Sequence, residues 1–72
     1  MKTRDIRLLD VVAMLKDASG EGIVLGQVGT VVEVLAPNVF EVEFANQDGE
    51  TIAMVAVDEK DLLLLHFEPV NI

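Results

Sequence analysis

The chain has 72 residues and a net charge of −8, 51% of its residues are hydrophobic, and it contains no cysteine. This length allows a single domain, 1–72, with 1–7 expected as a flexible or edge segment. The composition excludes a disordered chain, a disulfide framework and a thiolate metal site. Because a domain of this size buries only about 60% of the surface of its unfolded chain, contacts with a partner or a second copy are expected to add stability.

The first half of the chain predicts two strands. Residues 9–16 are apolar and partly β-branched, which favours a strand. Residues 17–22 are rich in turn formers and predict a loop. A second strand is predicted over 25–35, and its glycines Gly26 and Gly29 indicate a bend or bulge where a barrel has to curve.

The middle of the chain predicts a hairpin arrangement. Pro37 and Asn38 are typical of a tight turn, because proline presets φ and asparagine suits turn positions. Residues 39–44 alternate cleanly, with apolar side chains on one face and two glutamates on the other, and predict a strand. Asp48-Gly49 is a strong signal for the turn of the next hairpin.

The last third predicts a fourth strand over 51–57, one helical turn over 58–61 with Asp58 as its cap, and a short strand over 62–67. Five short strands with tight turns, and a helical turn before the last, predict an all-β fold, a small five-stranded SH3-like barrel. We expect the core of this barrel to contain Val11, Val32, Phe40, Val42, Phe44 and Val55.

The glutamates of the second and third strands are the most informative polar residues. If residues 36–38 form a three-residue loop, Leu35 pairs with Val39, and Glu33 falls opposite Glu41. Like charges directly opposite each other destabilise a sheet, so their presence calls for a reason.

The next hairpin extends this face to the fourth strand. If Asp48-Gly49 is a two-residue turn, Glu43 falls opposite Met54. An outward face that mixes acidic and apolar side chains is a candidate partner-binding surface. A solvated acidic face, whose apolar residues are covered by the N-terminal segment or the last strand, is the alternative. The candidate partner-binding residues are Glu33, Glu41, Glu43, Val31, Leu35, Val39 and Met54, with Ile52 beside them.

Residues that could carry chemistry are few. His66 is the single histidine, and one imidazole alone does not make a metal site. The acidic cluster Asp58, Glu59 and Asp61 lacks the alternating ligands and the glycine of a calcium loop. No arrangement of nucleophile, base and orienting group is evident. We therefore expect no enzymatic activity, no cofactor and no bound metal.

The charge is unevenly distributed. The first sixteen residues hold four of the five bases and two acids, whereas the remainder holds Lys60 and eleven acids. Such a body repels phosphate backbones and anionic lipid and suits a basic protein partner, so we expect no binding to nucleic acid or membrane. Charges interrupt the N-terminal residues, which do not resemble a signal peptide, and a cytoplasmic location is expected.

Four segments carry a family resemblance: GQVGTVVEV at 26–34, DVVA at 10–13, FEVEF at 40–44 and DGET at 48–51. The first is similar to the KOW-type opening of many SH3-like barrels. Over residues 8–66 the chain resembles the small bacterial family called domain of unknown function 4926. That resemblance implies no catalytic residues, and it implies gene arrangements that look like toxin–antitoxin pairs.

A looser likeness exists to accessory barrels of electron transfer, namely the small stromal subunit of photosystem I and the variable chain of ferredoxin–thioredoxin reductase. It rests on a G-x-V strand, a V-x-F strand and an acidic turn before the last strand.

Acidity, size and family resemblance together favour a non-enzymatic protein-interaction module, with an antitoxin-like neutraliser of a basic partner as its specific form. One alternative is an accessory subunit of a larger redox or metal enzyme. Another is a KOW-type nucleic-acid-associated protein, in which only Lys2, Arg4 and Arg7 could contact phosphate. Self-association into a homo-oligomer is compatible with each of these.

Overall fold

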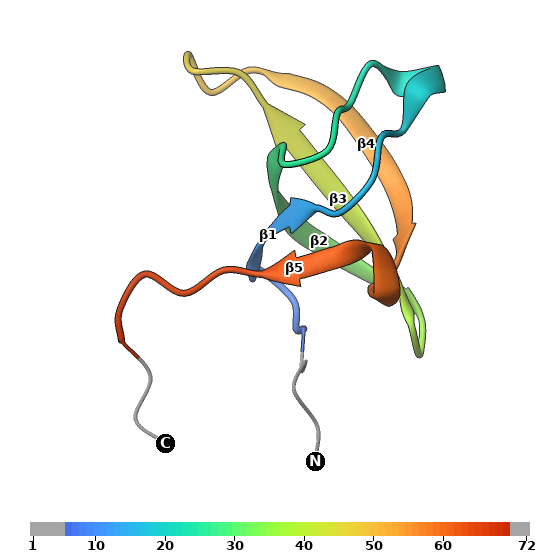
Figure 1. Cartoon of the computed structure of the whole chain (residues 1–72), viewed down its shortest axis with the longest axis vertical. Helices are drawn as coiled ribbons and strands as arrows, with labels where there is room; N and C mark the ends of the chain where they lie inside the picture. Colours follow the sequence, from blue (N-terminus) through green and yellow to red (C-terminus); the bar gives the residue numbers. More distant parts are fainter. Residues whose placement is uncertain (1–5, 70–72) are drawn as a thin grey trace.

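In the computed structural model, which describes residues 6–69, five antiparallel strands form one curled sheet (Figure 1). In the sheet the strands follow the order β4-β3-β2-β1-β5. Two single-turn 3-10 helices interrupt the strand order along the chain, and the second directly precedes the last strand. These findings confirm the all-β class, the five strands and the helical turn. The elements are β1 (Val11–Met14), η1 (Ser19–Glu21), β2 (Val28–Ala36), β3 (Val39–Ala45), β4 (Thr51–Asp58), η2 (Glu59–Asp61) and β5 (Leu62–Leu64).

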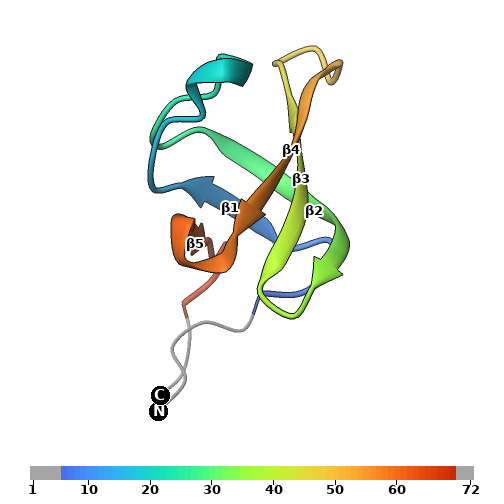
Figure 2. The same ribbon diagram turned by 90° about the vertical axis from the view of Figure 1, so that its right-hand side faces the viewer.

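The sheet curls toward a barrel without closing. Within the described residues its two edge strands, β4 and β5, do not pair with each other. Figure 2 shows β2, β3 and β4 as long, twisted strands and β1 and β5 as shorter ones. The SH3-like barrel is therefore an open one. No helix in the described part of the chain has the length and apolar character needed to cross a membrane.

Three strands are shorter than the sequence predicted, and the first of them also ends two residues earlier, at Met14. The first strand begins two residues later, because Asp10 N donates to Arg7 O and closes a turn over 7–10. The second strand begins only at Val28, since the chain turns through Gly26, whose φ of +89° suits glycine. The last strand ends at Leu64 rather than at residue 67.

The core lies inside the curl and is built on β3. Phe40, Val42 and Phe44 are buried, as predicted. Val11 and Val32 are only partly buried, so the prediction that they are core residues is wrong. Val55 is also partly buried but packs against the core. The other buried members of the core cluster are Ile6, Val12, Met14, Ile23, Val31, Val57 and Leu62.

The N-terminal segment contributes to this core. Ile6, the first described residue, is buried in it, although 1–7 was expected to be flexible or peripheral. Residues 1–5 of that segment lie outside the described residues.

Gly29, near the start of β2, leaves room for the inward side chains of the neighbouring strand β3. A Cβ atom at this position would lie 2.7 Å from Cγ1 of Val42 and 2.8 Å from Cδ1 of Phe44. Real Cβ atoms do not approach heavy atoms so closely, so only glycine fits without movement of the core. The sequence predicted a bend or bulge at Gly29. In the structure this glycine instead allows a close approach between β2 and β3.

Candidate partner-binding face

The turn between β2 and β3 sets the position of two glutamates. It contains two residues rather than three, because Ala36 pairs with Val39, so the predicted pairing of Leu35 with Val39 is wrong. A bulge at Leu35 then shifts the register by one residue. Glu33 consequently lies directly opposite Glu41, as predicted.

A second bulge, at Val32, removes one predicted residue from the face. Beyond it Val31 pairs with Val42, whose side chain points into the core. Val31 is fully buried, so its prediction as a partner-binding residue is wrong. An extra residue in one strand reverses the inward and outward positions that follow it, and sequence alternation alone does not show where this occurs.

The hairpin between β3 and β4 places the third glutamate. Residues 46–50 separate the two strands, and the hydrogen bond from Asn46 N to Glu50 O closes a three-residue loop, 47–49, in which Gly49 has a φ of +83°. A bulge near the start of β4 offsets the extra loop residue. Glu43 therefore lies opposite Met54, as predicted.

The acidic face, as we use the term, consists of Glu33, Glu41, Glu43, Val39 and Met54 on the outer side of β2, β3 and β4. Glu33 and Met54 are exposed, whereas the other members are partly buried. Strand pairing holds the three carboxylates on adjacent strands.

Two neighbouring residues complete the surroundings of this face. The Thr51 hydroxyl donates to Oε2 of Glu43 and orients that carboxylate. Ile52 and Leu35 are about half exposed, at the β4 and β2 bulges respectively. The face thus presents carboxylate acceptors next to apolar surface, which suits Lys or Arg side chains with their aliphatic stems.

A separate acidic groove of about 430 Å³ lies between the C-terminal half of β4 and the segment that joins β1 to η1. Asp61 at its wall is 3.2 Å from Nζ of Lys16 and 3.4 Å from Nζ of Lys60. Desolvation acts to raise the pKa of Asp61, but hydrogen bonds and attraction from both lysines outweigh it and hold the pKa below its ordinary value. The bridge from Lys16 ties the segment that follows β1 to η2, whereas the bridge from Lys60 lies within η2.

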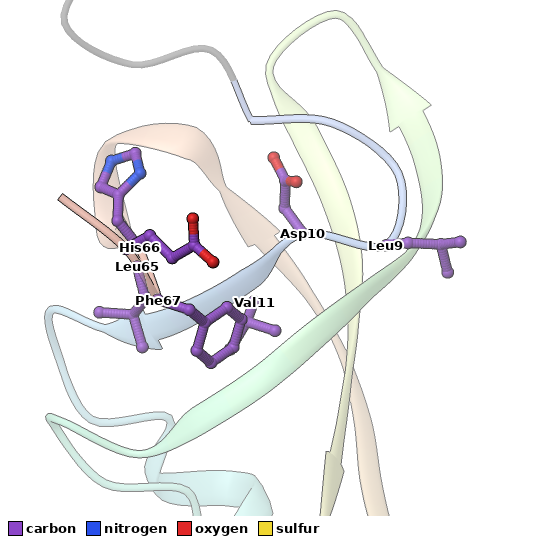
Figure 3. Close-up of a pocket in the computed structure, with 7 residues that line it drawn as sticks. Leu9, Asp10, Val11, Leu65, His66 and Phe67 are labelled. Atoms are coloured by element: carbon purple, nitrogen blue, oxygen red, sulfur yellow. The ribbon is translucent and has the colours of Figure 1, made fainter. Parts of the chain in front are cut away.

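Two carboxylates of the acidic cluster at 58–61, those of Asp58 and Asp61, form ion pairs with lysines. Asp58 lies 3.7 Å from Nζ of Lys60. It precedes η2 as predicted, but its side chain makes no capping hydrogen bond. Within residues 6–69 no group of three or more His, Cys, Asp and Glu side chains could hold a metal ion. His66 is exposed and lines a different groove, beside Phe67 (Figure 3).

Comparison with family models gives a match over most of the chain. A family model described as "Domain of unknown function (DUF4926)" matches residues 8–64. Neither the curated proteins nor the solved structures give a match.

Proposed function

The chain belongs to the domain of unknown function 4926 family, and from its acidic face we propose that it is a non-enzymatic protein-interaction module that binds a basic partner protein. The face on β2, β3 and β4 is the binding surface. Glu33, Glu41 and Glu43 contact Lys or Arg side chains of the partner, while Met54 and Val39 supply apolar contact.

One observation carries this proposal: Glu33 lies directly opposite Glu41 on adjacent strands. Like charges in that position destabilise an isolated sheet. Glu43 adds a third carboxylate on the same outer side of β3. Repulsion between these carboxylates lowers the stability of the free protein. In a complex, a cationic partner removes the repulsion, so the same arrangement favours binding.

The net charge of −8 also supports a basic partner protein. An acidic body steers a basic partner toward itself and accelerates encounter. An antitoxin-like neutraliser of a basic toxin is the specific form that we propose. The proposal includes a cytoplasmic location, where a domain folds without disulfides.

Affinity capture from the native host tests the proposal. Three baits are compared: the wild type, a face variant with Glu33→Gln, Glu41→Gln and Glu43→Gln, and a charge-matched control. The control carries Glu21→Gln, Asp48→Asn and Glu68→Gln, three exposed acids outside the acidic face. We expect a basic protein on the wild type and on the control, and its loss from the face variant.

Two results would contradict this function. Capture of no basic protein by the wild type would remove the partner class. Equal loss from the face variant and the control would show that net charge, not the acidic face, holds the partner.

A further inference from the structure

Strand β4 is a free edge of the sheet. It pairs with β3 on one side, and no strand among residues 6–69 pairs with its other side. The opposite edge strand, β5, has three residues, whereas β4 has eight. Proteins usually protect a long edge strand with proline, with charged side chains or with a covering loop. The β4 sequence TIAMVAVD contains no proline, and its one charged residue is the last, Asp58.

The hydrogen-bond pattern shows which backbone groups of β4 are unpaired. Glu59 N donates to Asn38 O, and each of these residues lies one position beyond the last β3–β4 pair, so that pair is a non-hydrogen-bonded one. Pairs of the two kinds alternate along an antiparallel ladder, so the pairs formed by Ala56 and Met54 are also non-hydrogen-bonded. Their N–H and C=O groups point away from β3, and within residues 6–69 these groups have no backbone partner.

The unpaired side of β4 borders the acidic groove of about 430 Å³. Residues 55–58 form one wall of the groove, and the segment that joins β1 to η1 forms the other. Figure 2 shows β3 on one side of β4 and η1 on the other. Apolar side chains of Met14, Val55 and Val57 also line the groove. The charged residues that line it within the described part of the chain are four acids and one base, namely Asp17, Glu21, Asp58, Asp61 and Lys16.

The same edge adjoins the acidic face. Strand pairing places Glu33, Glu41 and Ala56 in one row across β2, β3 and β4. A strand added beside β4 would place its own residue next in this row, about 4.8 Å beyond the β4 backbone. Ala56 is small and exposed, so the stem of a Lys or Arg in that position can lie across it and bring its charge toward Glu41.

Backbone geometry and charge together identify the occupant of this edge. Unpaired N–H and C=O groups along a strand bind an extended segment, which adds to the sheet. The excess of carboxylates in the groove and on the acidic face favours a cationic segment over a second copy of this chain, whose net charge is −8.

We propose that β4 binds an extended basic segment of the partner protein as an added antiparallel strand. In such a strand, the residues that exchange hydrogen bonds with Ala56 and Met54 lie directly opposite them, on the outer side of the sheet. These residues are Lys or Arg and contact the acidic face, while the intervening side chains enter the groove. This inference rests on the proposed function and specifies how the partner is held.

Hydrogen exchange at the β4 amides tests the proposal, with a synthetic peptide of four lysine-valine repeats as the probe. In the free chain the amides of Met54 and Ala56 should exchange rapidly, whereas those of Val55 and Val57, which bond to β3, should exchange slowly. The peptide should slow exchange at Met54 and Ala56. Slow exchange there in the free chain would show that a second copy or another part of the chain covers the edge, and would overturn the proposal, as would the absence of peptide binding.

Backbone methylation of the peptide separates strand addition from charge attraction alone. Methyl groups on the lysine backbone nitrogens remove the donors that face β4 and should weaken binding about tenfold or more. Methyl groups on the valine nitrogens, which face away from β4, should have a much smaller effect. Equal affinity of the two methylated peptides, whose charge is the same, would overturn the proposal.

A variant of β4 makes the complementary test. Ala56→Pro removes one N–H that faces the groove and keeps the bonds to β3, because an edge strand tolerates proline where its nitrogen faces solvent. It should weaken peptide binding about tenfold or more. Ala56→Ser keeps the N–H and is the matched control, which should bind as the wild type does. Thermal unfolding checks that both variants are folded, and the methylated peptides decide the question if Ala56→Pro is not.

The face variant distinguishes this inference from the proposed function. Loss of the peptide from the face variant, together with unchanged binding by a folded Ala56→Pro, would overturn strand addition and leave the proposed function standing. Capture of no basic protein by the wild type would instead overturn the proposed function.

Discussion

Two glycines, Gly29 and Gly20, differ in how closely neighbouring atoms approach them. Gly29 is buried near the start of β2, where Val42 and Phe44 of the neighbouring strand β3 occupy the space that a side chain would need. Gly20 lies in η1 with nothing within 4 Å of an added Cβ. Both read as turn or bend glycines in the sequence, and only the structure separates them, because the distinction depends on a neighbouring strand distant in the chain.

Gly29→Ala should therefore destabilise the domain by about 1–3 kcal/mol, the usual effect of overpacking a core. Gly20→Ala is the control and should leave stability unchanged or slightly raised, because φ at this position is not positive. Chemical denaturation of both variants makes the comparison. Equal effects would show that β2 does not approach β3 as described.

The ion pairs of Asp61 predict a pH dependence. Its pKa is lowered in the folded state, so its contribution to stability is present above the ordinary aspartate value of 3.8 and is lost as the pH falls through the folded value. Asp61→Asn should lower the thermal midpoint near neutral pH, and this difference from the wild type should shrink on acidification. Asp48→Asn, in the exposed hairpin loop, is the control. A difference that stays constant with pH would contradict the bridges to Lys16 and Lys60.

At the level of strands, sequence alternation predicts β3 accurately and β2 poorly. Phe40, Val42 and Phe44 alternate without interruption, so their inward face is correct. In β2, bulges at Val32 and Leu35 break the alternation, and Val31 moves from the predicted outer face into the core. Bulges depend on backbone twist and on the partner strand, neither of which a single strand sequence encodes.

The predicted pairings of Glu33 with Glu41 and of Glu43 with Met54 are correct because, in each hairpin, a wrong turn length and an unpredicted bulge cancel. The β2–β3 turn is one residue shorter than predicted, and the bulge at Leu35 restores the register. The β3–β4 loop is one residue longer, and a bulge in β4 restores that register. Glu33 opposite Glu41 was thus predicted correctly for a partly incorrect reason.

The pair can be measured directly. Glu41→Lys converts a repulsive cross-strand pair into an attractive one and should stabilise the free domain by about 0.2–1 kcal/mol. The gain should fall with added salt and should be smaller when Glu33→Gln is also present. Denaturation of the two single variants and the double variant gives the coupling. A coupling of zero at low salt would show that the two carboxylates do not face each other.

The outer side of the sheet is acidic on β2, β3 and β4 and apolar on β1 and β5, where Leu63 is about half exposed. Composition and charge predicted the acidic part. The apolar part was missed, because the apolar runs 9–16 and 62–67 were read only as strands. Apolar side chains at both odd and even positions of β1 and β5 are the signal that could have revealed it.

The central claim is that the acidic face binds a basic protein. Its most direct test is the association rate of the captured partner with the wild type and with Glu41→Lys, measured over a range of salt concentrations. We predict that the wild-type rate falls with salt, and that Glu41→Lys associates more slowly with a shallower salt dependence. Equal rates and equal salt dependence for the two proteins would contradict binding through this face.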